Sequence, residues 1–298
     1  MKRYLLLDFI FMGVLMGNSI EIHTCYGNRH QLIVEGRLLE QRTLKEEDLN
    51  DGFWRNGWRK LKQLVNNEIK NSPIVLRVAK EQFERHSDDE GYFEFHIEVK
   101  TNLEDQETIA LELTERNSSQ SCQLTLLSPS LKVGIISDFD DTLVVSNVTN
   151  KIMLIYNLLF ENYKQRNEVK GMVEKIKTIL AQNPSTRSVP FFVITGSPKQ
   201  LYKSINRFLD HHDFPPRTLI TKKIHGKNAD SLFHQEAYKY QEIEQIILLY
   251  PHIRWVLFGD SGEKDREIYT AIAKQYPEHI EAIYIRDVEG GKLIKEQL

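Results

Sequence analysis

The feature that most constrains the fold is the regular alternation of short apolar runs and helical periodicity in the second half of the chain. Apolar runs of strand length lie at 133–137, 190–195, 218–221, 253–258 and 280–285. Between them, 150–183, 200–211, 235–249 and 265–275 carry apolar residues at helical spacing. Strands that alternate with helices join through crossovers, so this order predicts a parallel sheet with helices on both faces.

The first half of the chain has the pattern of an antiparallel β-domain. Strand-like runs lie at 31–35, 74–78, 92–99 and 108–113, and the segment 92–99 alternates apolar and polar residues. The segment 43–70 carries Trp54, Trp58 and Leu61 at helical spacing and predicts one helix or long loop. A polar, Ser-rich stretch at 115–121 precedes a last apolar run to about 131. We therefore expect a β-rich, sandwich-like accessory domain over 1–130 and a second domain over 131–298.

Composition narrows the function classes. The chain has 298 residues, 41% of them apolar, which is enough for one large or two modest cores. Its 39 basic and 42 acidic residues leave a net charge of -3, which gives no reason to expect a nucleic-acid partner. Cys25 and Cys122 lie far apart in the sequence and form no metal-type spacing, which favours a reducing, cytoplasmic compartment.

The N-terminus has a short apolar stretch at 5–16, preceded by Lys2 and Arg3. Asp8 and Gly13 interrupt this stretch, so we expect it to pack on the folded body, and export by a signal stays open as the alternative. No later segment approaches the ~20 apolar residues that cross a bilayer, so no transmembrane segment is expected.

Acidic and hydroxyl residues follow three predicted strands at the point where each strand ends. Asp138 and Asp140 come directly after the run 133–137, Thr195 ends the second run, and Asp260 follows the run 253–258. The carboxyl ends of parallel strands meet at one edge of a sheet, so these side chains should converge. A carboxylate pair binds a divalent cation or divides the roles of nucleophile and general acid/base.

Each motif also has an ordinary structural explanation. The stretch 138–142 fits a solvated acidic loop, and Thr195 fits either a phosphate-binding turn or a helix cap. Asp265 fits a capping acid of the following helix. The coincidence of three motifs at three strand ends favours a single catalytic site.

This order of motifs resembles the haloacid dehalogenase superfamily, most of whose members transfer phosphoryl groups through an aspartyl-phosphate. Residues 131–289 resemble more closely the catalytic domain of the actin-patch phosphatidate phosphatase family, which is related to the lipins. The matching segments are 136–142, 170–172, 191–202, 207–209, 214–215, 257–269 and 282–288. Residues before 131 resemble only loosely the accessory domain of bacterial members. The resemblance implies a doubly wound, haloacid dehalogenase-like parallel sheet.

The resemblance also implies roles for the motif residues. Asp138 would be the nucleophile and Asp140 the general acid and base. Mg²⁺ would be held by the carboxylates of Asp138 and Asp260 and by the backbone carbonyl of Asp140, a ligand set that suits this cation. Thr195 and the backbone of Gly196 would hold the transferring phosphoryl group. The residues expected to support the site without doing chemistry are Asp141, Thr142, Ser261 and Asp265.

The superfamily also uses a lysine beside the nucleophile, and the sequence leaves its identity open. Lys239, at the start of the helix before the last motif, matches the family position best. Lys222, Lys223 and Lys227 are rivals because they follow the preceding strand.

The spacing of the motifs leaves no room for a sizeable cap domain. Asp141 and Thr195 are 54 positions apart (195 − 141), and Thr221 and Lys239 are 18 apart (239 − 221). An open site suits a substrate that is presented on a surface. The lysines near this edge would either contact an anionic membrane or remain solvated, and they are Lys199, Lys203, Lys222, Lys223 and Lys227.

The leading hypothesis is therefore a Mg²⁺-dependent, phosphatidate phosphatase-like phosphomonoester hydrolase. It would be cytoplasmic or peripherally bound to a membrane. Two alternatives are a phosphatase for soluble or protein phosphomonoesters and a non-catalytic phosphatidate-binding module. Binding modules of this kind lack the catalytic acids, whereas Asp138, Asp140 and Asp260 are all present, which favours the enzyme.

Overall fold

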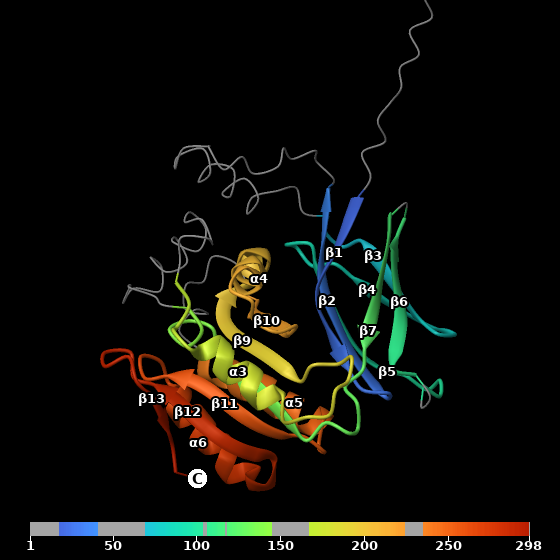
Figure 1. Cartoon of the computed structure of the whole chain (residues 1–298). Coiled ribbons are helices and arrows are strands. Elements are labelled where there is room, and N and C mark those ends of the chain that lie inside the picture. The colour runs from blue at the N-terminus through green and yellow to red at the C-terminus, as the bar shows by residue number, and fades with distance from the viewer. Residues whose placement is uncertain are drawn as a thin grey trace, which may run out of the picture.

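The computed structural model describes residues 18–40, 69–103, 106–116, 118–144, 167–223 and 235–297. Several expectations fall outside these ranges: the apolar stretch 5–16, most of the predicted helix at 43–70, the part of the helical segment from 150 to 166, and Lys227. The described residues form three sheets, two antiparallel and one largely parallel (Figure 1). No helix within the described ranges is both long and apolar enough to cross a membrane.

The six-stranded sheet belongs to the second half of the chain. Its strands are β8 (Val133–Ser137), β9 (Phe191–Pro198), β10 (Thr218–Lys222), β11 (Arg254–Asp260), β12 (Ile280–Arg286) and β13 (Leu293–Lys295). They lie in the order β10-β9-β8-β11-β12-β13; the first five are parallel, and β13 pairs antiparallel with β12. The predicted parallel sheet is thus confirmed. The short, mostly exposed β13 was not predicted because it lacks an apolar run.

Four helices cover this sheet: α3 (Met172–Leu180), α4 (Tyr202–His211), α5 (Gln235–Leu249) and α6 (Asp265–Gln275). Successive side chains of a strand pack against different helices, as expected for a sheet that is buried on both faces. On β11, Val256 and Phe258 share a core with α3 and α4, whereas Trp255 and Leu257 share a core with α5 and α6. Both faces of the parallel sheet are therefore covered by helices.

The described residues of the N-terminal half form two antiparallel sheets. One contains β1 (Asn18–Gly27), β2 (Gln31–Glu40) and β5 (Tyr92–Glu98). The other has the order β4-β3-β6-β7 and contains β3 (Pro73–Val78), β4 (Glu81–His86), β6 (Thr108–Glu115) and β7 (Ser118–Thr125). Leu32 and Phe95 of the first sheet share one core with Leu76 and Leu113 of the second. The structure thus has the predicted antiparallel sheets.

The sequence analysis described 115–121 as a polar, Ser-rich stretch, and the structure places residues from Ser118 onward in the strand β7. β7 pairs along its whole length with β6, from Thr108 opposite Thr125 to Glu115 opposite Ser118. It is the last strand of its sheet, and Leu124 is its only buried residue. An edge strand of this kind has too little apolar alternation to be recognised.

The first antiparallel sheet packs against the edge of the parallel sheet at β10. Tyr26 and Ile33 belong to the same apolar cluster as Phe192 of β9. The Thr24 hydroxyl donates to the Leu219 carbonyl at 2.8 Å. The two halves of the chain therefore share part of one core as well as hydrogen bonds.

Three of the lysines considered for membrane contact are paired with carboxylates of the N-terminal half of the chain. The pairs are Lys199 with Glu35 at 2.6 Å, Lys203 with Glu21 at 2.5 Å, and Lys223 with Asp88. Lys199 and Glu35 are both buried. In this arrangement the three ammonium groups join the two parts of the chain, so the expected membrane contact by these lysines gains no support.

Candidate active site

The first acidic motif lies directly beyond the end of β8. The amide of Asp138 donates to the Phe258 carbonyl at 2.8 Å, so the chain still runs alongside β11 at this point. Asp141 then adopts a left-handed backbone, with a φ of 55°. Such a conformation is rare for a residue with a side chain and is stabilised only by its surroundings. The Arg286 guanidinium donates to the Asp141 carbonyl at 2.6 Å and holds this turn.

A lysine from α5 lies at the centre of the acidic cluster. Lys239 Nζ is 2.7 Å from Asp138 Oδ1, 2.7 Å from Asp265 Oδ1 and 2.8 Å from Glu263 Oε2. Its side chain is only 2% exposed, as is Asp138. The buried Lys239 ammonium therefore faces three carboxylates, and its positive charge offsets part of their negative charge.

Burial and crowding shift the pKa values of this cluster. Burial raises the pKa of Asp138 well above its usual value, although the Lys239 charge opposes this change. Burial also raises the pKa of Asp260 to about 7, assisted by the charges of Asp265 and Glu263. Burial disfavours the Lys239 ammonium, but Asp138 and the neighbouring acids raise its pKa well above the usual value. Burial thus favours the protonated form of Asp138 and Asp260, and the Lys239 charge opposes this shift.

The second acid of the motif contacts the end of β9. The hydroxyls of Thr195 and Ser197 both donate to Asp140 Oδ2, at 3.1 and 3.2 Å. The Ser197 amide donates to Thr195 Oγ1 at 3.0 Å. All three side chains are buried. Two hydroxyls therefore fix the orientation of the Asp140 carboxyl group.

Asp260 ends β11 and lies beside the Lys239 cluster. Its Oδ1 accepts the amides of Gly262 at 2.6 Å and of Glu263 at 3.0 Å. Its Oδ2 is buried and has no hydrogen-bond partner among the described residues, and the same holds for Asp138 Oδ2. Buried carboxylate oxygens without a donor are costly. These two oxygens fit a divalent cation with oxygen ligands, such as Mg²⁺.

Asp138 also belongs to a group of three acids, together with Glu263 and Asp265. One carboxylate oxygen of each lies within 4.8 Å of the other two. This group surrounds the Lys239 ammonium, which is in contact with all three carboxylates. The lysine therefore already supplies a positive charge to this group, whereas Asp138 Oδ2 and Asp260 Oδ2 have no hydrogen-bond donor among the described residues.

The structure brings Asp138, Asp140, Thr195, Lys239 and Asp260 to the carboxyl edge of the sheet, as the sequence analysis expected. Among the rival lysines, Lys223 pairs with Asp88, and Lys222 lies 5.8 Å from the centre of the Tyr238 ring. The geometry thus favours Lys239, whose catalytic role stays a prediction.

The residues expected to support the site differ in position. Asp265 contacts Lys239, and Thr142 is fully buried. Ser261 is exposed, and its hydroxyl instead accepts the Val288 amide at 3.1 Å.

Sequence reasoning missed three residues that contact the site. Ser197 bonds Asp140, Glu263 pairs with Lys239, and Arg286 holds the Asp141 turn. Ser197 and Glu263 lie within two or three residues of a motif, which could have suggested them. Arg286 ends β12, and nothing local to it in the sequence points to Asp141.

Gly259, between Phe258 and Asp260, tests how tightly the site is packed. A Cβ at this position would lie 2.6 Å from the Asp265 Cβ and 2.8 Å from the Tyr269 ring. We expect Gly259→Ala to lower the free energy of unfolding by about 1–3 kcal/mol, because neither neighbour can move without disturbing Lys239 or α6. Denaturant unfolding measures this change, and an unaltered midpoint would contradict the packing described.

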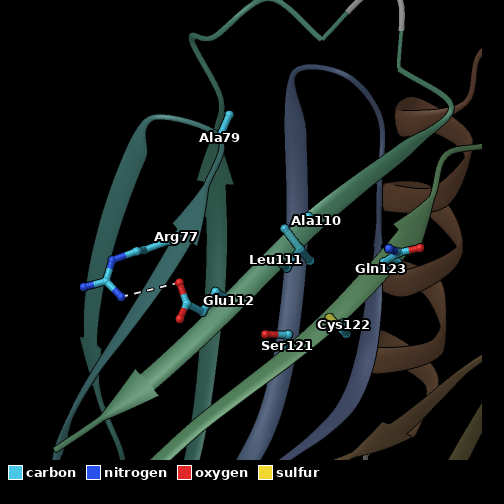
Figure 2. Close-up of a pocket in the computed structure, with 8 residues that line it drawn as sticks. All are labelled: Arg77, Ala79, Ala110, Leu111, Glu112, Ser121, Cys122 and Gln123. Carbon is cyan, nitrogen blue, oxygen red and sulfur yellow. Dashed lines mark ion pairs between the residues drawn. The ribbon is translucent and has the colours of Figure 1, made fainter.

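A pocket on β3, β6 and β7 lies elsewhere and is lined by none of the candidate site residues (Figure 2). Its residues include the Arg77–Glu112 pair, whose charged atoms are 3.6 Å apart. This pocket is therefore separate from the acidic centre.

The molecule is an α/β protein whose parallel sheet is covered by helices. Its acidic side chains and a buried lysine lie at the carboxyl edge of this sheet, where α/β proteins bind their ligands. The family model of the catalytic domain of phosphatidate phosphatase APP1 matches residues 133–287, just over half of the chain. The chain belongs to this family. The resemblance inferred from the motifs is thus confirmed at the level of the family.

Two curated relatives match the same region. Phosphatidate phosphatase APP1 of Saccharomyces cerevisiae is 32% identical over 155 residues, covering 52% of this chain and 26% of the relative. An uncharacterized protein of Schizosaccharomyces pombe is 25% identical over 157 residues, covering 52% of this chain and 25% of the relative. The matched region thus spans about a quarter of the length of these relatives.

Among solved structures, a carbohydrate acetylesterase from Xanthomonas citri aligns with a TM-score of 0.30 and 8% identity, covering 91% of this chain and 68% of its own. A TM-score this low carries no argument about fold or function.

Proposed function

We propose that this chain is a Mg²⁺-dependent phosphatidate phosphatase that acts through an aspartyl-phosphate. The observation that carries the proposal is the buried contact between Lys239 and Asp138, beside an Asp140 held by Thr195. Membership of the APP1 catalytic-domain family supports the same reaction. The parallel sheet would be of the doubly wound haloacid dehalogenase type. Residues 131–298 would form the catalytic domain and 1–130 an accessory domain.

In the first step, an Asp138 carboxylate oxygen attacks the phosphorus, and the bond from phosphorus to the alcohol oxygen breaks. An anionic nucleophile and an anionic phosphate repel each other, so a preorganised positive charge lowers the barrier. Lys239, 2.7 Å from Asp138, supplies that charge without any rearrangement of the protein.

Asp140 handles the protons of both steps. Its carboxylic acid donates a proton to the leaving alcohol oxygen, and its carboxylate then accepts a proton from the water that attacks the aspartyl-phosphate. The hydroxyls of Thr195 and Ser197 fix Asp140 for this task. Thr195 and the Gly196 backbone would also hold the transferring phosphoryl group.

Mg²⁺ would be held by the carboxylates of Asp138 and Asp260, each of which has a buried oxygen without a donor among the described residues, and by the backbone carbonyl of Asp140. When bound, the cation supplies positive charge to the phosphoryl oxygens and favours the ionised carboxylates. Burial has raised the pKa values of Asp138 and Asp260, so each carboxylate gains stability from a cation. Asp265 keeps Lys239 in place and does not contact the reacting atoms.

The experiment that tests this function is phosphate release by the purified full chain, with and without Mg²⁺. The substrates are phosphatidate in mixed micelles and a panel of soluble phosphomonoesters. We expect Mg²⁺-dependent turnover with a clear preference for phosphatidate. A preference for a soluble ester would mean that the same reaction serves a soluble substrate and not phosphatidate. Binding of phosphatidate without turnover would favour a binding module.

Asp260→Asn tests the metal site. The substitution removes one ligand charge and keeps the shape, so half-maximal activation should require at least about tenfold more Mg²⁺. In the wild type, the requirement should rise as the pH falls below 7, because protons compete for a carboxylate whose pKa is about 7. Mg²⁺ titrations of activity at pH 6 and pH 8 measure both effects. The exposed Asp89→Asn serves as the control, and an unchanged Mg²⁺ requirement in Asp260→Asn would place the metal elsewhere.

A further inference from the structure

The two cysteines of the chain, 97 positions apart (122 − 25), meet inside the N-terminal sandwich. Cys25 of β1 lies opposite Val34 of β2, and Cys122 of β7 lies opposite Leu111 of β6. Directly opposed residues share one face of a sheet, and Val34 and Leu111 both belong to the core between the sheets. Both cysteines pack against that same core. Their side chains therefore point towards each other from two different sheets.

The strands that carry the cysteines run side by side at the open edge of the sandwich. The Ser118 hydroxyl of β7 donates to the Asn18 carbonyl of β1 at 2.8 Å, which joins the two sheets at this edge. Figure 2 shows Cys122 on β7 between Ser121 and Gln123, at a pocket on the surface of the sheet. Both cysteines are free thiols of intermediate exposure. A small reagent can therefore approach this edge.

Because both side chains pack on one core from neighbouring strands, the Cys25 thiol lies close enough to act as a hydrogen-bond donor to the Cys122 sulfur. This bond lowers the pKa of Cys122, because the Cys25 S–H group stabilises the Cys122 thiolate. The same contact, together with burial, raises the pKa of Cys25 well above its usual value. Cys122 also lines the surface pocket of Figure 2, whereas Cys25 does not. Since the thiolate is the reactive form, the more accessible Cys122 is the first nucleophile and Cys25 the resolving thiol.

We propose that Cys25 and Cys122 form a thiol–disulfide exchange site, which a small disulfide of the glutathione class oxidises to an internal disulfide. The Cys122 thiolate attacks one sulfur of glutathione disulfide, and one glutathione leaves as the S–S bond breaks. Cys25 then attacks the Cys122 sulfur of the mixed disulfide and releases the second glutathione. Two protein thiols are oxidised, one glutathione disulfide is reduced to two glutathiones, and the two cysteine protons end on these products.

The internal disulfide would link β1 to β7 and so connect the two sheets covalently. A cross-link between residues far apart in the sequence restricts the unfolded chain strongly. Oxidation should therefore stabilise the sandwich, whose first sheet packs against β10. The reaction involves none of the residues proposed for phosphatase activity, so its test is independent of that function.

The test is to incubate the full chain, purified under reducing conditions, with glutathione disulfide, and then to measure its intact mass and free thiols. We expect the mass to fall by two hydrogen atoms, both thiols to disappear, and peptide mapping to find Cys25 joined to Cys122. A reducing agent should reverse the change. Retention of both thiols, a stable glutathione adduct on the wild type, or a disulfide-linked dimer would each overturn the proposal.

Two single variants separate the roles of the thiols. Cys25→Ser should stop at the mixed disulfide and gain the mass of one glutathione, whereas Cys122→Ser should react at least about tenfold more slowly. Oxidised wild type should melt about 5 °C or more above the reduced protein, and the double serine variant should show no such shift. Because the mass and melting measurements on the wild type need no variant, a folding defect in a serine variant leaves the test intact. Faster reaction of Cys122→Ser than of Cys25→Ser would contradict the assigned order.

Discussion

Asp138→Asn should lower turnover by a factor of about 10⁴ or more on every substrate of the enzyme, because an amide cannot form the acyl-phosphate. The substitution keeps the shape of the side chain but removes a negative charge that faces Lys239. Asp138 is buried and crowded by other acids, so the variant should fold and melt at or above the wild-type temperature. Loss of turnover without loss of stability separates a chemical role from a structural one.

The measurement is the initial rate of phosphate release at saturating Mg²⁺, with the folded fraction checked by circular dichroism. Asp89→Asn, in an exposed turn, is the matched control and should retain wild-type activity. Asp138→Asn activity within tenfold of wild type would exclude Asp138 as the nucleophile.

Lys239→Ala should have the second-largest effect, with turnover lowered by about 10² to 10³, the typical cost of losing one preorganised electrostatic contact. It should also destabilise the fold by about 3–5 kcal/mol, because the buried Asp138 and Asp265 and the half-buried Glu263 lose their shared cation. Turnover must therefore be compared at a temperature where the variant is folded. A lysine that acts on the phosphoryl group is needed for a soluble ester as much as for a lipid, so both substrates should lose activity equally.

Lys222→Ala and Lys223→Ala are the comparison variants. Both residues were rivals for the same role; in the structure Lys223 pairs with Asp88, and Lys222 lies 5.8 Å from the centre of the Tyr238 ring. Each variant should change turnover on a soluble ester less than about fivefold. If Lys239→Ala keeps full activity while one of these variants loses it, that lysine takes over the role.

The positions of the acids at the candidate site could be predicted because they depend on local patterns. A short apolar strand followed by an acid predicts a carboxylate at the edge of a parallel sheet, and Asp138 and Asp260 lie there. Lys239 was harder to assign, since a helical lysine reaches the site only through tertiary packing. Even so, its place at the start of α5 favoured it over its rivals.

The contacts that could not be predicted join residues far apart in the chain. Lys199 was considered for membrane contact, yet its partner is Glu35 of β2, 164 positions away. Two other contacts were missed for the same reason. Arg286 bonds Asp141, 145 positions away, and Cys25 and Cys122 come from different sheets. A wide separation of cysteines in the sequence does not exclude their meeting in the fold.

The central claim, that Asp138 carries the phosphoryl group, is tested most directly by trapping the phosphoenzyme. Asp140→Asn should accumulate it with a nitrophenyl phosphate, whose leaving group needs no proton, because the variant lacks the base that activates water. Acid quenching followed by peptide mass spectrometry should find one phosphoryl group on Asp138, and hydroxylamine should remove it. A phosphoryl group on any other residue would contradict the mechanism. So would an Asp140→Asn variant that turns over at the wild-type rate and accumulates no phosphoenzyme.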